Sequence, residues 1–418
     1  MSFILKNSLN YTEKKVSSGN FLVGDDAEIS DVSLCGKECN DSVGIHDCLI
    51  LPGFCDVHVH FREPGYLYKE DIYSGSLSAA AGGFTDVCAM PNLDPVPDSA
   101  ENLKVQLDAI RKKAVVGVHP YGAITVGEKG ERLSDMEGMA ENVIAFSDDG
   151  KGVQSGEIME EAMKEAKRLG KIIAAHCEDN SLLFGGYIHD GKYAASHAHR
   201  GICSESEWKQ IERDVGLAAK TGCAYHVCHI SAKESVRIIR EAKASGVDVT
   251  CETAPHYLLL DDGDLLEDGR FKMNPPLRDR ADREALTEGI LDGTVDMIAT
   301  DHAPHSREEK SRGLERSLMG VVGLETAFPV LYTGLVKKGV ISLDRLVELM
   351  CFNPRKRFGL SGNPGFSIWS MSEKYRVDPE KFHTKGRSTP FEGMEVYGRC
   401  IATFRDGREI YSSDLSDN

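Results

Sequence analysis

The chain has 418 residues, and its 49 Lys and Arg against 66 Asp and Glu give a formal net charge of −17 at pH 7. This acidic balance argues against nucleic acid or an anionic membrane as the main partner, and no apolar run is long enough to span a bilayer. Hydrophobic residues make up 41% of the chain, which is enough for a sizeable core. The length favours one large domain with a small companion.

Twelve cysteines are scattered along the chain without a CxxC pair, so we interpret most of them as small buried side chains. The opening residues, MSFILKNSLNYTEKK, contain no cationic stretch followed by an apolar segment, so no signal peptide is predicted. These features are typical of a cytoplasmic enzyme with reduced thiols.

Short apolar runs alternate with stretches of helical pattern from about residue 50 to about residue 350. Residues 1–50 before them, and the tail after about residue 360, show strand alternation instead. The apolar runs predict eight buried strands, at 54–61, 84–90, 114–124, 142–149, 171–179, 224–231, 247–257 and 295–305.

Three helices are predicted between these strands, at 101–114, 157–170 and 231–246. The first begins just after Asp98 and Ser99, either of which can cap its amino end. The third opens with Ser231 and has Glu234 three residues later, which is the pattern of a capping box, and it ends at Gly246.

Eight buried strands, each followed by a helix or a long loop, predict an α/β fold: a (β/α)8 barrel of the TIM type. The GxGxxG and GxxxxGK[ST] motifs of nucleotide-binding open sheets are absent from the sequence. The terminal segments are each too short to bury a core, so we expect them to pair as a small β-domain. The predicted boundaries are 51–355 for the catalytic barrel and 1–50 with 356–418 for the small β-domain.

The first barrel strand carries an HxH pair. Residues two apart on a strand point to the same face, so His58 and His60 converge, while Val57 and Val59 are expected to pack outward against helices. Other predicted strands also end in nitrogen or oxygen donors, at the edge where barrel active sites form. We therefore predict a metal site with the ligands His58, His60, Asp149, His176, His229 and Asp301. This mixture of imidazole and carboxylate favours zinc, as one or two ions, with manganese or cobalt tolerated.

Four neighbouring residues are set aside. Asp148 should face away from Asp149, and His226 should lie deeper than His229 in a structural or supporting role. His119 and His256 are expected to form hydrogen bonds in loops or at the rim of the barrel.

A divalent ion in such a site lowers the pKa of bound water from about 15.7 to about 7. Asp301, at the last strand, is placed to ligate the metal and to take the proton from that water. It could then pass the proton to a leaving nitrogen. The predicted chemistry is hydrolysis of an amide-like bond, or its reversal.

Several motifs together resemble those of the dihydroorotases in the amidohydrolase superfamily. They are HVHFREPG (58–65), FSDDG (146–150), AAHCED (174–179), HVCHIS (226–231), KMNPPLR (272–278) and TDHAPHSREEK (300–310). The fourth strand has Asp149 where hydantoinases, allantoinases and the other main dihydroorotase type carry a carboxylated lysine, which resembles one bacterial branch. The resemblance implies reversible cyclisation of N-carbamoyl-L-aspartate to L-dihydroorotate with loss of water, a step of pyrimidine biosynthesis.

Both of these molecules are anions, so a chain with a charge of −17 needs local cations around its substrate. The planar guanidinium of Arg62 suits a carboxylate, and Asn92 and His305 can complete the grip. The substrate contacts that the resemblance implies are His60, Phe61, Arg62, Asn92, Asn274, His305, Met319 and Gly320. Two stretches depart from the family pattern, namely Ser317-Leu318-Met319-Gly320 and Leu93-Asp94.

Two alternatives to an active dihydroorotase fit the sequence less well. A hydantoinase or allantoinase would carry a lysine in the fourth strand and no carboxylate clamp, and this sequence shows the reverse. An inactive homologue that serves as a scaffold for aspartate transcarbamoylase would have lost metal-binding histidines, and all four are present. A homodimer is the expected assembly, and a partnership with aspartate transcarbamoylase is compatible with the sequence.

Overall fold

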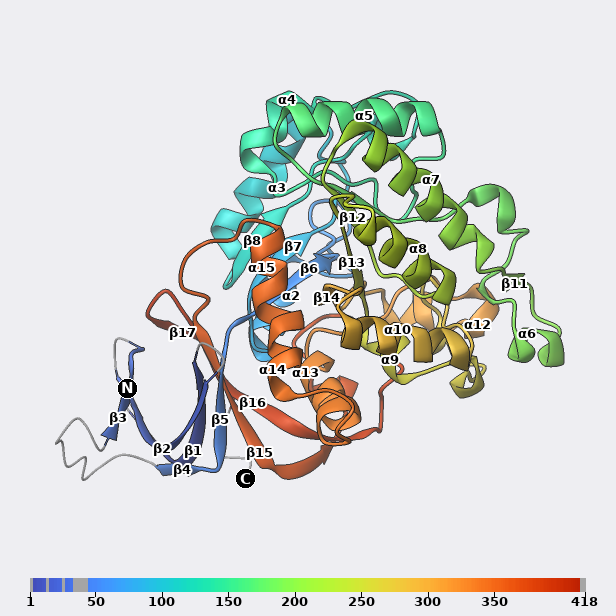
Figure 1. The fold of residues 1–418 in the computed structure, drawn as a ribbon. Coiled ribbons are helices and arrows are strands. Elements are labelled where there is room, and N and C mark those ends of the chain that lie inside the picture. Colours follow the sequence, from blue (N-terminus) through green and yellow to red (C-terminus); the bar gives the residue numbers. More distant parts are fainter. Residues whose placement is uncertain (1–2, 13–14, 25–26, 33–43, 414–418) are drawn as a thin grey trace.

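A ring of parallel strands lies at the centre of the computed structural model, which describes residues 3–12, 15–24, 27–32 and 44–413 (Figure 1). Parallel pairing joins β6 to β7 and β8, and separately β9 to β12, β13 and β14. The bounds of these strands are β6 (Phe54–Val59), β7 (Phe84–Ala89), β8 (Gly117–Pro120), β9 (Ile173–Ala175), β12 (Tyr225–Val227), β13 (Val249–Thr253) and β14 (Met297–Ile298).

Isolated bridges close this ring at two places. Phe146 bridges Gly122 on one side and Ile173 on the other, so its segment takes the position of the fourth strand. Val59 of β6 bridges His302, which follows β14. The predicted strand at 142–149 is therefore reduced to a bridging residue, and the prediction of a (β/α)8 barrel is confirmed.

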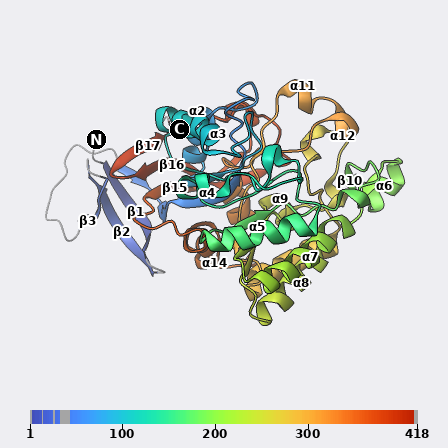
Figure 2. The ribbon, with the colours of Figure 1, turned by 90° about the horizontal axis from the view of Figure 1, so that it is seen from above.

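Helices surround the ring on its outer side (Figures 1 and 2). The longer ones are α2 (Ile72–Ala81), α3 (Ala100–Lys113), α5 (Gly156–Arg168), α7 (Glu205–Thr221), α8 (Lys233–Ala244) and α10 (Arg280–Asp292). Shorter ones are α4 (Met136–Met139), α6 (Lys192–His197), α9 (Pro255–Leu259), α11 (Arg307–Lys310), α12 (Gly313–Arg316), α13 (Ala327–Leu331), α14 (Leu343–Val347) and α15 (Asn353–Arg357).

The amino end of α3 is capped as the sequence predicts, because the Ser99 side chain accepts a hydrogen bond from the backbone N–H of Asn102. The capping box predicted at Ser231 is wrong. The residue at the cap of α8 is Ala232, and the Ser231 hydroxyl donates to the carboxylate of Glu207 on α7 instead. A distant carboxylate thus replaces the local cap.

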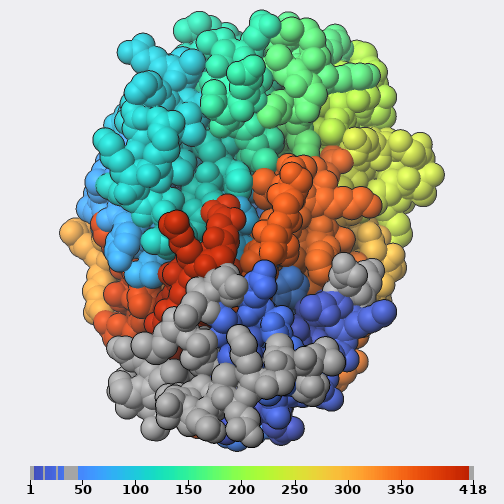
Figure 3. Space-filling view, turned by 90° about the vertical axis from the view of Figure 1, so that its left-hand side faces the viewer, coloured from blue at the N-terminus to red at the C-terminus, as the bar shows by residue number. Residues whose placement is uncertain are grey.

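Both ends of the chain contribute to a second sheet beside the barrel. Its strand order is β17-β16-β15-β5-β1-β2-β3, with β4 paired to β1. The antiparallel pair of β5 and β15 joins the two ends, and Figure 3 shows the blue N-terminal and red C-terminal residues on one face. The bounds are β1 (Phe3–Thr12), β2 (Lys15–Val23), β3 (Ile29–Asp31), β4 (Gly44–His46), β5 (Cys48–Pro52), β15 (Phe366–Arg376), β16 (Glu395–Arg405) and β17 (Arg408–Ser412).

This sheet confirms the small β-domain built from the terminal segments. The residue boundaries of the two parts stay a prediction. Among the described residues, no helix is both long and apolar enough to cross a membrane.

The core of the barrel has an outer and an inner layer. Val59 packs in the outer layer with helix residues such as Ile72, as predicted. Val57 belongs instead to a separate cluster with Cys88, Ala174 and other strand residues, so its predicted outward packing is wrong. The pairing of β6 with β7 shifts register between Asp56 and Val59, and this shift breaks the strict two-residue alternation.

The buried carboxylate of Glu207 supports the start of α8. It accepts hydrogen bonds from the backbone N–H groups of Ser231 and Ala232 and from the Ser235 hydroxyl, and it lies 3.5 Å from a guanidinium nitrogen of Arg278. Its removal would leave these donors buried without an acceptor.

We expect Glu207→Ala to lower the free energy of unfolding by about 3 kcal/mol, measured by urea unfolding followed by circular dichroism. The matched control is Glu212→Ala, because Glu212 is an exposed residue of the same helix. Equal stability of the two variants would contradict the assigned role of Glu207.

Candidate active site

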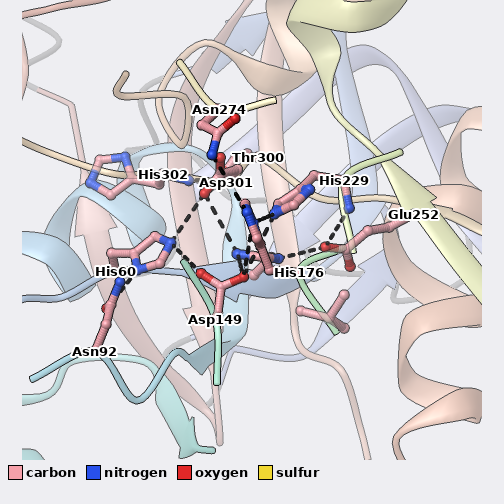
Figure 4. Close-up of polar contacts among 12 residues, drawn as sticks. His60, Asn92, Asp149, His176, His229, Glu252, Asn274, Thr300, Asp301 and His302 are labelled. Atoms are coloured by element: carbon pink, nitrogen blue, oxygen red, sulfur yellow. Dashed lines mark hydrogen bonds and ion pairs between the residues drawn. The ribbon is translucent and has the colours of Figure 1, made fainter. Parts of the chain in front are cut away.

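Two groups of side chains meet around Asp149 at the carboxyl end of the barrel (Figure 4). The first group contains His58 and His60 from the end of β6. His58 Nε2 lies 3.3 Å from Asp149 Oδ1, and His60 Nε2 lies 3.4 Å from Asp149 Oδ2. All three residues are buried.

The second group joins Asp149 to His176, which follows β9, and His229, which follows β12. His176 Nδ1 and His229 Nε2 are 3.0 Å apart, and they lie 3.9 Å and 3.6 Å from Asp149 Oδ1. Asp149 therefore faces both groups, and the potential ligand atoms within each group lie within 4.8 Å of one another.

Asp301 follows β14 and lies on the side of the first group. Its Oδ1 is 3.1 Å from His60 Nε2 and 3.6 Å from His58 Nε2. Asp301 and His229 both have positive φ angles, +47° and +32°, which L-residues rarely adopt. Backbone strain of this kind is concentrated at functional sites, where the surrounding structure holds it in place.

The donor set fits a bound cation. His58 Nε2 and Asp149 Oδ1 are buried and have no hydrogen-bond partner among the described residues. A buried polar atom without a partner costs about 1–3 kcal/mol, and a metal ion between these atoms would satisfy both. Imidazole nitrogen and carboxylate oxygen are the ligands that zinc and similar ions prefer.

Both carboxylates of the site are held in the ionised form. Burial opposes ionisation of Asp149, but the adjacent imidazoles of His58 and His229 outweigh it and hold its pKa well below the usual range. Burial likewise opposes ionisation of Asp301, and the hydrogen bond with His60 outweighs it and lowers the pKa.

Glu252 of β13 is a functional residue that the sequence reasoning missed. Its buried carboxylate accepts a hydrogen bond from His58 Nδ1 at 2.7 Å and contacts His226 Nε2 at 3.0 Å. The first bond leaves His58 Nε2 free to face Asp149, as is usual for metal-binding histidines. A glutamate inside the apolar run 247–257 was the available signal.

A cavity of about 240 Å³ lies directly above these groups. Most of the predicted substrate contacts line it together with several of the predicted ligands: His60, Arg62, Asn92, Asp149, Gly150, His176, His229, Asn274, Asp301, Ala303, His305, Met319 and Gly320. Phe61 is not among them, because its buried ring lies against Gly75 of α2.

Arg62 and Asn92 offer hydrogen-bond donors to this cavity. Arg62 donates through Nε to the carbonyl of Pro304 at 3.3 Å, and its terminal nitrogens form no hydrogen bond in the described part of the chain. Asn92 accepts from His60 Nδ1 at 2.8 Å through Oδ1, which leaves its amide nitrogen as a donor. Together these groups suit a carboxylate.

His305 has both ring nitrogens engaged. Nε2 donates to the carbonyl of Met319 at 2.8 Å, and Nδ1 lies 3.3 Å from the ammonium of Lys69. Burial, with the positive charges of Arg62 and Lys69, lowers the pKa of His305 to about 3 and keeps the ring neutral. The ring lines the cavity without a free N–H.

The four residues set aside lie outside the two groups. Asp148 accepts from the backbone of Ile124 and Thr125, and His119 contacts Asp86 at 2.9 Å. The prediction of a hydrogen bond in a loop or at the rim is wrong for His256, which is buried with Nε2 lacking a partner among the described residues. The start of α9 turns its ring into the core.

Comparison with known proteins shows which family this chain belongs to. Residues 47–235 match the family described as "Dihydro-orotase-like". The chain is 51% identical over 377 residues to a dihydroorotase of Fusobacterium nucleatum, covering 88% of this chain and 89% of that protein. It is 47% identical over 428 residues to a dihydroorotase of Geobacillus thermodenitrificans, covering 98% and 99%.

Solved structures with the same architecture include an L-hydantoinase from Arthrobacter aurescens, with a TM-score of 0.81 and 25% identity over 98% of this chain and 96% of that one. A dihydropyrimidinase from Brevibacillus agri has a TM-score of 0.81 at 21% identity, over 98% and 95% of the two chains. The identities over nearly the whole length decide the family. The chain belongs to the dihydroorotase family and is an enzyme of the metal-dependent amidohydrolase type.

Proposed function

We propose that this enzyme interconverts N-carbamoyl-L-aspartate and L-dihydroorotate in pyrimidine biosynthesis. The observation that carries the proposal is the arrangement of two histidine groups around Asp149 beneath a cavity with Arg62 and Asn92 in its wall. The ligand groups suit hydrolysis or formation of a cyclic amide bond. The two donors suit the ring carboxylate, which hydantoin-type substrates lack. An assay of both directions with metal-loaded protein tests the proposal.

The proposed metal is zinc, with two ions per chain. One ion would be held by His58, His60 and Asp149, with Asp301 beside them, and the other by Asp149, His176 and His229. A divalent cation at this place supplies Lewis acidity, which polarises a carbonyl and acidifies water.

Asp301 is the proposed general base and acid. Its carboxylate is ionised and contacts His60, so in the hydrolytic direction it can accept a proton at Oδ1 from the attacking water. It then returns this proton to the leaving ring nitrogen, and cyclisation runs through the same positions in reverse.

The remaining proposed contacts orient the substrate. Arg62 pairs with the ring carboxylate through its terminal nitrogens, and the Asn92 amide donates to the same group. Asn274, Met319 and Gly320 also line the cavity, together with the buried ring of His305. Phe61 contributes through its position between His60 and Arg62.

The proposal also concerns assembly and location. We propose a cytoplasmic location, which suits an acidic chain that acts on a small molecule. We propose a homodimer that is also able to associate with aspartate transcarbamoylase. Size-exclusion chromatography of the protein alone, and of the two proteins mixed, tests both statements.

Cyclic-amide hydrolysis of hydantoin-type rings is the second candidate, since solved structures named hydantoinase share the fold. Asp149 at the fourth strand and the Arg62–Asn92 pair favour a carboxylate-bearing ring instead. A panel of dihydroorotate, hydantoin and allantoin decides between them. We expect turnover of dihydroorotate alone.

Asp301→Asn should lower kcat by about 10³-fold, since a general base contributes about 10²–10⁴-fold. Elemental analysis should still find metal, because the histidine ligands remain. The control is Asp190→Asn, a change at an exposed aspartate, which should leave kcat unchanged. Most of the activity remaining in Asp301→Asn would refute the role.

Arg62→Gln should raise the KM for dihydroorotate by about 100-fold, because truncating one partner of a buried charge pair costs about 2–5 kcal/mol. Steady-state kinetics measures this change. Arg316→Gln, at an exposed arginine of α12, is the control. An unchanged KM would exclude Arg62 from the carboxylate site.

Asp149→Ala should remove both ions, whereas His60→Ala and His229→Ala should each weaken only one, because Asp149 alone belongs to both groups. Metal content is measured by plasma mass spectrometry after dialysis. It should fall from two equivalents to none in Asp149→Ala, and to one in His60→Ala and in His229→Ala. A wild-type content of a single equivalent would disprove the two-ion arrangement.

A further inference from the structure

Lys310, the last residue of α11, is a buried lysine just outside the cavity, with an exposed fraction of 6%. Its ammonium donates to three backbone carbonyls, those of Lys272 at 2.9 Å, Leu318 at 2.8 Å and Gly320 at 2.7 Å. An ammonium has three N–H donors, so these contacts use all of them. No carboxylate in the described part of the chain forms an ion pair with it.

A buried charge without a counter-ion is costly and is rarely kept for stability alone. The three carbonyls belong to two segments that are far apart in the sequence. Lys272 stands two residues before Asn274, whereas Leu318 and Gly320 flank Met319. Asn274, Met319 and Gly320 all line the cavity. The ammonium therefore joins two parts of the cavity wall.

Other contacts show how closely the 318–320 segment is placed. The Met319 carbonyl accepts from His305 Nε2, and the Gly320 N–H donates to the Lys272 carbonyl at 3.0 Å. Gly320 has a φ of +134°, and a Cβ there would lie 2.7 Å from the carbonyl oxygen of Ala303. The backbone of residues 318–320 is therefore closely packed, and Lys310 bonds its carbonyls from the side away from the cavity.

We propose that Lys310 is a positioning residue for substrate binding, whose ammonium holds the 318–320 segment against Lys272 and thereby sets the places of Met319, Asn274 and His305. This inference rests on the proposed function. Lys310 does not line the cavity, so it acts through these neighbours. Its loss should weaken substrate binding more than it slows the chemical step, since the metal ligands and Asp301 are not among its partners.

The test is steady-state kinetics of metal-loaded Lys310→Met, which keeps most of the side-chain volume but removes the donors. We expect the KM for dihydroorotate to rise by about tenfold or more, because three carbonyls lose their donor. The value of kcat should stay within about threefold, and metal content should not change. Lys171→Met is the matched control, because its ammonium bonds the Val143 carbonyl at 2.7 Å just before β9, at the opposite end of the barrel.

Chemical rescue separates positioning from a general loss of stability. A second cavity of about 310 Å³ is lined by Lys310 and His305 together with exposed residues such as Arg307, so small molecules have access to this position. In Lys310→Ala, n-propylammonium should lower the raised KM towards the wild-type value, whereas 1-propanol should not. Neither compound should alter the wild-type KM.

An unchanged KM in folded Lys310→Met, or a fall in kcat and metal content at constant KM, would overturn the inference. If Lys310→Met does not fold, Lys310→Gln, which retains two N–H donors, takes its place with the same expectations. Wild-type enzyme without turnover of dihydroorotate would refute the proposed function. Active wild-type enzyme with an insensitive Lys310 would refute only this inference.

Discussion

The carboxylate of Asp149 is the group on which the arrangement of the site depends. His60 lies on one side of it and His176 and His229 on the other (Figure 4), and His58 Nε2 lies 3.3 Å from its Oδ1. Four imidazoles gathered in a buried space would otherwise present lone pairs to one another without a partner. The Asp149 carboxylate lies between them and can bind a cation together with either pair of histidines, which makes their close approach favourable. The ligands come from the ends of several strands: His58 and His60 from β6, His176 after β9, His229 after β12 and Asp301 after β14.

Bringing these ligands together requires strained backbone conformations. Asp301 and His229 adopt positive φ angles, and Arg62 does so as well, with φ +60°. Carboxylates behind the ligands fix ring orientation, as Glu252 does for His58. Arg62, His229 and Asp301 follow β6, β12 and β14, which are each paired with a neighbouring strand, so the barrel acts as a rigid frame for a locally unfavourable backbone.

The net charge of the whole chain is negative, whereas Arg62 places a positive charge in the cavity wall. A net charge of −17 disfavours large anionic partners, yet the guanidinium of Arg62 lines the cavity and the ammonium of Lys69 lies 3.3 Å from the cavity residue His305. These cations act over a few ångströms in a buried setting, where screening by solvent is weak. A small anion therefore meets a local field that the total charge does not reveal.

Local patterns predicted much of this arrangement. The HxH pair, the donors at strand ends and the alternation of apolar runs with helical stretches were enough to predict a barrel with a metal site at its carboxyl edge. The cap of α8 could not be predicted, because Ser231 bonds to Glu207, a residue distant in sequence. The inward position of Val57 depends on a register shift between two strands. The burial of His256 depends on how α9 meets the core.

The sequence alone determined which chemistry the chain has, because ligand types, their spacing on strands and the terminal strand patterns are local properties. Only the tertiary structure decided how these residues share their partners. It placed Asp149 in both histidine groups and gave both ring nitrogens of His305 a polar neighbour. It also brought Glu252 to His58 Nδ1, and the ammonium of Lys310 to the carbonyls of Lys272, Leu318 and Gly320. Most of these contacts join residues that lie tens to hundreds of positions apart. Their geometry follows from barrel closure, which no local pattern encodes.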